Sequence, residues 1–442
     1  MTALLETTDQ KSDLRRVLGL AVPALIVLAA EPLYVLVDTA VVGHLHGSAL
    51  ASLAIGGSVL TFAAWLGTVL AYGTTGRAAR RFGAGDRAGA VGEGVQASWI
   101  AITVGVVIAV LGQFLAGPVA RALAGSDGDV AAHAAGWLRI AALGAPGLLL
   151  ATAGNGWMRG VQDTRRPVYF VVGANLLSAV LCPLLVYPAG LGLRGSAIAN
   201  VTAQTVVGTL FVVALVRERV PLRPHPEMLR GQLTGGRDLL IRGAAFQLAF
   251  LSAAAVASRF GAPVLGAHQI ALSLWLFCSL VLDALAIAAQ SLVGAALGAS
   301  EVERARSVAA RITKFGLGCG VLLGLLILAG WHVIPRWFST DPRVYAQAAI
   351  AWPWFVLMQP LGGVLFALDG ILIGAGDLRF MRNMTLVAAL GGFVPLIWLS
   401  LVFDWGLRGI WIGLTAFIVI RLVAALSRFR SGRWAVAGVV RS

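Results

Sequence analysis

Charged residues are scarce in this chain of 442 residues. Only 12% of the residues are charged, 58% are hydrophobic, and the mean hydropathy is +0.85. Soluble globular domains carry about 25% charged residues. The deficit excludes an ordinary cytosolic enzyme and indicates a chain that crosses the membrane repeatedly.

Cysteines and the common catalytic motifs are scarce or missing as well. Cys182, Cys278 and Cys319 lie in apolar segments without CxxC spacing, so we expect buried thiols and neither a disulfide nor a metal site. No GxxxxGK[ST] phosphate loop, soluble ATPase-sized segment or Asp-rich diphosphate motif occurs. We therefore expect neither an enzyme nor a cofactor, and any pumping must draw on an ion gradient.

Long uncharged runs are what the sequence has instead. Residues 167–193 and 315–335 contain no Asp, Glu, Lys or Arg, and about 20 apolar residues suffice to cross the hydrocarbon. All such runs together predict an all-α integral membrane protein with twelve transmembrane helices. The predicted helices are centred near residues 31, 62, 106, 145, 178, 206, 248, 276, 322, 358, 393 and 415.

The basic residues that give the chain its net charge of +14 lie mainly in every second predicted loop and in the two terminal segments. By the positive-inside rule this pattern places both termini in the cytoplasm, so the charge reflects topology and does not indicate nucleic-acid binding. Acidic residues before position 14 and a long first apolar segment predict a retained first helix, not a cleaved leader. The basic segments are the N-terminal tail, 77–87, 159–166, 217–242, 304–314, 379–382 and the residues from Arg421 onward.

The two halves of the chain repeat one another. Residues 192–195 (GLRG) recur as 406–409, and 159–165 align with 373–379 at the same offset of 214 residues. A unit of six spans keeps its orientation when duplicated, so the repeat is parallel, with a pseudo-twofold axis along the membrane normal. We predict an N-terminal bundle (1–216), a cytoplasmic linker (217–237) and a C-terminal bundle (238–442), which enclose a cavity suited to alternating access.

Four segments stand out along the chain, in order: 37–45 (VDTAVVGHL), 158–164 (MRGVQDT), 267–270 (AHQI) and 369–375 (DGILIGA). They resemble the multidrug and toxic compound extrusion (MATE) transporters, and in particular their DinF-like branch. The resemblance covers essentially the whole chain in order. It implies a V-shaped carrier that exchanges H⁺ or Na⁺ for organic, often cationic, compounds.

Asp38 is the first candidate for ion coupling. A charged carboxylate that faces lipid costs roughly 2.5 to 3.5 kcal/mol, so Asp38 must face the interior or be protonated. Apolar surroundings favour the neutral form and a nearby organic cation favours the anion. One site then holds either a proton or a cation, which is the basis of antiport. The alternative is that Asp38 only hydrogen-bonds a neighbouring helix, but the resemblance also places the coupling aspartate of the family at Asp38.

Glu31 lies seven residues earlier, on the same face of the predicted helix. It is predicted either as a second titrating group or as a structural hydrogen-bond partner. Pro32, between the two acids, lets the helix bend or merely packs as a kink.

The predicted fifth helix departs from the family pattern. Members that bind Na⁺ there use an Asn and an Asp one turn apart, and this chain has Ser178 and Cys182. Na⁺ prefers several hard oxygen ligands, so we predict H⁺ as the coupling ion. Polar residues are expected to line the substrate cavity, and for the three Asn residues among them an interhelical hydrogen bond is an equal alternative. These residues are Tyr34, Asn155, Asn175, Ser178 and Asn200.

In the C-terminal bundle Asp369 has a family counterpart and no basic partner nearby in sequence. We predict that Asp369 and Gln269 contact substrate, and that a second ion site, which gives Na⁺ as an alternative coupling ion, includes Asp369, Asp283 and Gln290. His268 is expected to be a hydrogen-bonded interfacial histidine near a helix end, with a proton relay as the alternative. Candidates for stacking on an aromatic substrate are Trp157, Trp275 and Trp354, which otherwise face lipid.

The sequence as a whole predicts a monomeric, proton-coupled antiporter that exports amphipathic, cationic small molecules. The family resemblance and the excess of arginine over lysine place it in a bacterial plasma membrane, among lipids. A lipid-linked precursor flippase is the runner-up, but it needs a basic cavity, and only Arg139 and Arg242 are predicted inside helices. A Na⁺-coupled exporter and a channel-like or structural membrane protein are further alternatives.

Overall fold

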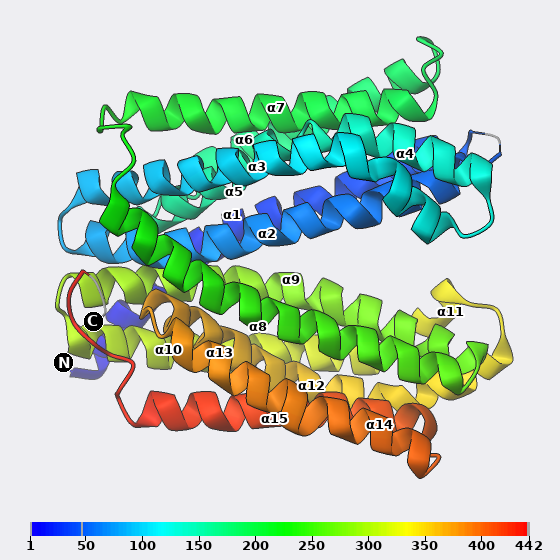
Figure 1. Ribbon diagram of the computed structural model, residues 1–442. Helices are drawn as coiled ribbons and strands as arrows, with labels where there is room; N and C mark the ends of the chain where they lie inside the picture. The colour runs from blue at the N-terminus through cyan, green and yellow to red at the C-terminus, as the bar shows by residue number, and fades with distance from the viewer. Residues whose placement is uncertain (1, 46, 440–442) are drawn as a thin grey trace. The chain divides into compact units, whose positions relative to one another are not determined.

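The structure is a computed structural model that describes residues 2–45 and 47–439, with side chains from residue 15 onward. Its secondary structure in this part of the chain is entirely helical (Figure 1). The first half contains α1 (Thr2–Gly43), α2 (Ala49–Gly83), α3 (Arg87–Ala124), α4 (Gly128–Ala142), α5 (Ala145–Gly160), α6 (Arg165–Val186) and α7 (Leu193–Arg217).

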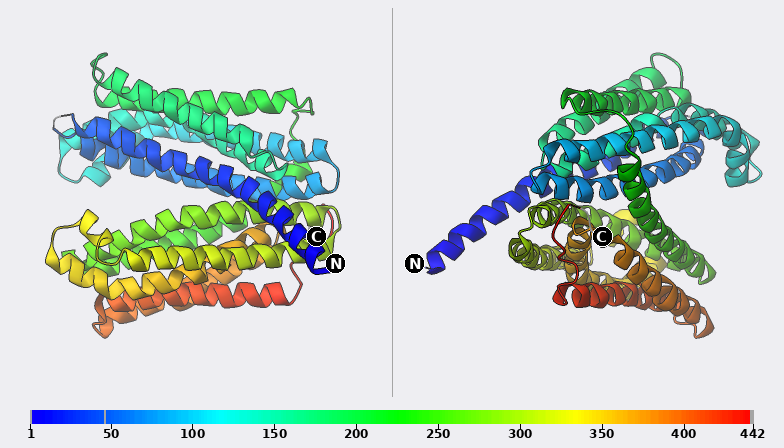
Figure 2. Two further views of the ribbon diagram at one scale, coloured as in Figure 1. Left: turned by 180° about the vertical axis from the view of Figure 1, so that it is seen from behind. Right: turned by 60° about the vertical axis from the view of Figure 1, so that its left-hand side comes forward.

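The second half follows the same plan, and the chain can be followed by colour in Figure 2. It contains α8 (Pro226–Arg259), α9 (Ala262–Gly298), α10 (Val302–Ala329), α11 (Ile334–Phe338), α12 (Pro342–Gly374), α13 (Leu378–Leu386), a π-helical stretch η1 (Val387–Phe393), α14 (Val394–Val402) and α15 (Gly406–Arg430).

The described residues form eleven helical segments that are long and apolar enough to span a membrane. A twelfth span consists of α4 and α5, which are bent by 49° at a short break. The break lies at the predicted centre of the fourth span, just before Pro146. Proline lacks a backbone N–H and fits the first turn of a new helix. The predicted all-α membrane fold with twelve spans is confirmed.

The chain divides into two compact units. The first unit is Val22–Gly236, and the second combines Met1–Ala21 with Arg237–Ser442. Residues 1 and 440–442 of the predicted bundles lie outside the described residues. Helix α8 begins at Pro226, so the second half of the predicted linker is helical.

Glycines bring the backbones of neighbouring helices into direct contact in both units. In the first unit, a Cβ atom at Gly156 would lie 2.9 Å from the carbonyl oxygen of Ala71. In the second unit, a Cβ at Gly370 would lie 2.2 Å from the carbonyl oxygen of Ala286. Small residues allow such close packing between membrane helices. The two contacts are related by the sequence repeat, because α2 packs on α5 as α9 packs on α12.

Several arginines that were expected in loops lie within helices, and this corrects the predicted span ends. Arg80 is buried in α2, Arg159 in α5 and Arg421 in α15. Hydropathy places the end of a span at the first charged residue, whereas an arginine with a partner inside the protein lets the helix continue.

Candidate functional site

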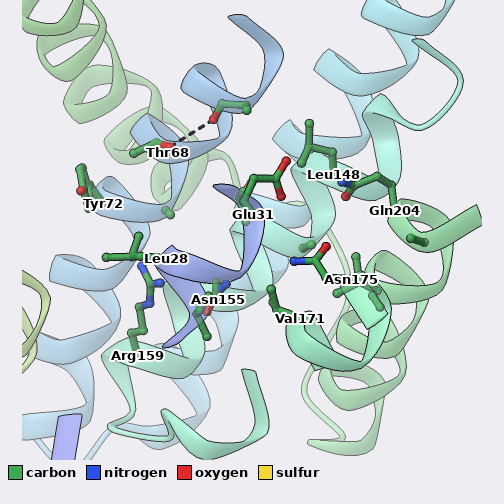
Figure 3. A pocket seen from close by; sticks show the side chains of 18 residues that line it. Leu28, Glu31, Thr68, Tyr72, Leu148, Asn155, Arg159, Val171, Asn175 and Gln204 are labelled. Carbon is green, nitrogen blue, oxygen red and sulfur yellow. Dashed lines mark hydrogen bonds between the residues drawn. The ribbon is translucent and has the colours of Figure 1, made fainter. Parts of the chain in front are cut away.

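The first unit contains a cavity of about 180 Å³ within its membrane-spanning helices (Figure 3). Helices α1, α2, α5, α6 and α7 contribute its walls. Apolar walls with a few polar groups are typical of small-molecule sites. The polar and charged lining residues are Glu31, Thr68, Tyr72, Thr152, Asn155, Arg159, Asn175 and Gln204.

The cavity contains one acidic and one basic side chain. Glu31 on α1 is half-buried, and Arg159 on α5 is buried. An arginine keeps its charge, whereas the charge of a carboxyl group depends on its neighbours, because apolar surroundings favour the neutral form and a nearby cation favours the anion. The cavity therefore combines a fixed positive charge with a group that can be neutral or negative.

Asp38 does not line this cavity but lies buried in a separate polar cluster in the same unit. The thiol of Cys182 donates a hydrogen bond to Oδ1 of Asp38 at 3.1 Å. The hydroxyl of Ser196 is also hydrogen-bonded to Asp38. The side chain thus faces the interior of the unit and not lipid. Cys182 occupies the position where the family resemblance expects a carboxylate.

Three more predicted lining residues belong to this cluster. The amide of Asn200 donates to the hydroxyl of Tyr34 at 3.5 Å, and Ser178 is buried beside them. We call Tyr34, Asp38, Ser178, Cys182 and Asn200 the Asp38 cluster. The cavity therefore receives only Glu31, Asn155 and Asn175 of the predicted N-terminal site residues.

In the second unit Asp369 on α12 is paired with two arginines. Nη2 of Arg421 lies 2.6 Å from Oδ2 of Asp369, and Nη2 of Arg242 lies 2.5 Å from the same oxygen. Both partners are distant from Asp369 in sequence, by 52 and 127 residues, so the sequence near Asp369 shows no basic partner. Two guanidinium groups at one carboxylate disfavour a bound cation there.

The other predicted residues of the second unit lie on α9. Gln269 is exposed, Asp283 is half-buried, and Gln290 is buried. His268, near the start of α9, is buried with its ring 6.1 Å from that of Trp411, and neither ring nitrogen has a hydrogen-bond partner among the described residues.

The three tryptophans proposed for stacking have different surroundings. Trp157 and Trp275 are buried. Trp354 is half-buried and lines a second pocket together with Gln347 and Arg408.

Comparisons with known proteins identify the family. The family model described as MatE matches residues 23–184 and again 239–399. The chain is 31% identical to the protein DETOXIFICATION 44, chloroplastic, of Arabidopsis thaliana, over 95% of this chain and 83% of that protein. The chain belongs to the MATE family.

Two further comparisons agree with this MATE assignment. The chain is 31% identical to the DNA damage-inducible protein F of Escherichia coli strain K12, over 95% of this chain and 93% of that protein. A solved structure described as MATE in the bent conformation superposes with a TM-score of 0.87 at 23% identity, covering 95% of each chain.

Membership of the MATE family makes this chain a multi-pass membrane transporter of small molecules and not an enzyme. The double match of the family model confirms that the two halves are copies of one unit. The expectation that the helix interiors lack cations other than Arg139 and Arg242 is wrong, because Arg159 and Arg421 are also buried in spans. Efflux is favoured over lipid flipping by the family match.

Proposed function

We propose that this MATE transporter is a proton-coupled antiporter that exports amphipathic organic cations. The observation that carries the proposal is a carboxyl group, Glu31, in an otherwise largely apolar cavity inside the membrane spans. When ionised, Glu31 attracts a cationic group in a medium of low dielectric constant, and when protonated it loses that attraction.

The two acids of α1 are proposed to have different roles. Glu31 lines the cavity and pairs with the cationic group of the substrate. Asp38 is closed off in its own cluster, two helical turns away, and holds the transported proton. Protonation of Glu31 from outside, by way of Asp38, releases the substrate outward, and loss of that proton inside restores binding.

The surroundings of Asp38 support a proton over Na⁺. Its hydrogen-bond partners are the thiol of Cys182 and the hydroxyl of Ser196, with no second carboxylate in the cluster. Na⁺ prefers several hard oxygen ligands. In the second unit, Asp369 is already compensated by Arg242 and Arg421.

The cavity also supports a substrate with a charged end and an apolar body. Its volume of about 180 Å³ is smaller than the roughly 300–1,000 Å³ of drug-sized sites, so only part of a large compound enters it. Arg159 repels a second cationic group and so orients the charged end toward Glu31.

We place the transporter as a monomer in a bacterial plasma membrane with both termini in the cytoplasm. The concentration of basic residues in alternate connections supports this orientation. It also accounts for the net charge without a nucleic-acid partner.

Reconstitution into liposomes with separately imposed ion gradients tests the proposal. A proton gradient is expected to drive ethidium transport, and a Na⁺ gradient at constant pH is expected to have no effect. Transport driven by Na⁺ alone would overturn the proton assignment. Ethidium transport that neither gradient affects would overturn antiport itself.

A further inference from the structure

The second unit contains a buried group of two arginines and one aspartate inside its membrane spans. Arg242 on α8 and Arg421 on α15 both donate from Nη2 to a single oxygen, Oδ2 of Asp369 on α12. We call these three residues the arginine–aspartate cluster. Its formal charge is +1, which is costly to bury among membrane helices.

The hydrogen-bonding capacity of the cluster is only partly used. Oδ1 of Asp369 and Nε of both arginines have no hydrogen-bond partner among the described residues. Arg421 is only 4% exposed. A guanidinium group matches a carboxylate best through two parallel N–H···O bonds, and one carboxylate cannot provide such a pair to two arginines. The cluster therefore has donors for a second anion.

Aromatic rings cover the faces of the two guanidinium groups. The Cζ atom of Arg421 lies 4.7 Å from the ring centre of Phe246 and 5.3 Å from that of Phe417. The Cζ atom of Arg242 lies 5.3 Å from the same Phe246 ring. Stacking on a ring leaves the N–H edge of a guanidinium available. The surroundings thus suit an anion with an attached flat, apolar body.

The internal repeat places the cluster at the counterpart of the first unit's cavity. At the offset of 214 residues, Asp369 corresponds to Asn155, Phe417 to Ala203 and Arg421 to Val207. All three counterparts line that cavity. Contacts between the glycine-packed helices support the alignment, since Gly370 meets Ala286 as Gly156 meets Ala71.

The same comparison extends to α8. At the offset of 215 residues, which also relates Ala71 to Ala286, Arg242 and Phe246 correspond to Val27 and Glu31. Both of these residues line the cavity of the first unit. The acid of one copy is thus replaced by an aromatic ring next to arginines in the other copy.

We propose that the arginine–aspartate cluster binds the carboxylate group of an aromatic organic acid. The carboxylate accepts from the unpaired Nε–H groups of Arg242 and Arg421 and replaces Asp369 as the acceptor of one of the two Nη2 bonds. The proposed binding of a carboxylate at the cluster does not depend on the proposed export function. Its use as a second substrate subsite, for anionic compounds, rests on the proposed export function.

Thermal unfolding of the purified full-length protein in detergent tests the binding. Sodium benzoate is the probe, benzyl alcohol is its uncharged analogue, and sodium chloride controls for Na⁺ and a simple anion. Benzoate is expected to raise the midpoint temperature in a saturable manner, and the other two are not. Equal stabilisation by chloride, or none by benzoate, would overturn the proposal.

Variants separate a binding site from a merely structural ion cluster. Arg421→Gln is expected to abolish the benzoate effect, whereas Arg428→Gln is expected to retain it. Arg428 is a matched control because it lies on the same helix and pairs with a different acid, Asp377. If both Arg→Gln variants lose the benzoate effect equally, the cluster is not the site.

Asp369→Asn is expected to change the affinity for benzoate in the opposite direction to Arg421→Gln. This test does not require the arginine variants to fold. Removal of the competing carboxylate is expected to strengthen benzoate binding about tenfold. A structural role predicts lower stability with no gain in benzoate affinity. Asp38→Asn is expected to keep the benzoate effect, so failure of this inference and failure of proton coupling are distinguishable.

Discussion

At the scale of single residues, the two acids of α1 are predicted to respond differently to neutralisation. Glu31→Gln removes the negative charge from the cavity and is expected to weaken ethidium binding about tenfold, or about 1.4 kcal/mol. Asp38→Asn is expected to leave binding within about threefold but to abolish proton-driven transport. Binding is measured by fluorescence anisotropy in detergent, and transport in liposomes.

Glu303→Gln is the matched control, because Glu303 is an exposed acid on α10 with only a surface ion pair. It is expected to behave as the wild type in both assays. If Asp38→Asn still transports at the wild-type rate, Asp38 is not the proton carrier.

Cys182 is predicted to be the residue that excludes Na⁺ from the Asp38 cluster. Cys182→Asp supplies a second carboxylate next to Asp38, and two like charges at close range favour a shared cation. Ethidium transport by this variant is expected to respond to a Na⁺ gradient. Cys182→Ser keeps a hydrogen-bond donor without adding charge and is expected to remain proton-driven. Equal responses of the two variants to Na⁺ would contradict this role.

The sequence located some of these residues and missed others for physical reasons. Asp38 and Glu31 are the only charged residues in a long apolar run. The cost of a charge exposed to lipid therefore predicts that both face inward. The partners of Asp369 are distant in sequence and meet it only in the folded unit. Arg421 carried a usable signal, since residues 409–420 and 422–427 are uncharged and place it inside a span.

At the scale of helices, the glycine contacts fix how neighbouring spans approach. A Cβ at Gly374 would lie 2.5 Å from the carbonyl oxygen of Gln290, which is backbone and cannot rotate away. Gly374→Ala is therefore expected to destabilise the protein by about 1–3 kcal/mol. Thermal unfolding in detergent, followed by tryptophan fluorescence, measures the effect.

The control for this prediction is Gly318→Ala on α10, because no atom lies within 4 Å of a Cβ built there. Alanine favours a helix over glycine by about 1 kcal/mol, so this variant is expected to be at least as stable as the wild type. Equal stability of the two variants would contradict close packing at Gly374.

Helix number was predictable from sequence, but helix ends were not. Hydropathy counts apolar residues, and each span has enough of them to be found. Several helices continue past the apolar run, as α2 does through the buried Arg80 to Gly83. The break between α4 and α5 was also missed, although Pro146 marks it.

At the scale of the whole molecule, duplication has given two copies with different chemistry. The first unit has an acid in a cavity, and the second has two arginines around an aspartate at the corresponding positions. The repeat was visible in the sequence as short matching segments. The difference in charged residues between the two copies is visible only from the contacts of the folded unit, because the sequence assigns Arg421 to a basic C-terminal segment.

Substrate-driven proton movement tests the central claim most directly. Liposomes with a pH-sensitive dye inside and a clamped membrane potential receive ethidium outside. The account predicts a proton flux opposite to ethidium entry for the wild type and for Glu303→Gln, and none for Asp38→Asn. A proton flux in Asp38→Asn equal to that of the wild type, or ethidium entry without proton movement in the wild type, would contradict it.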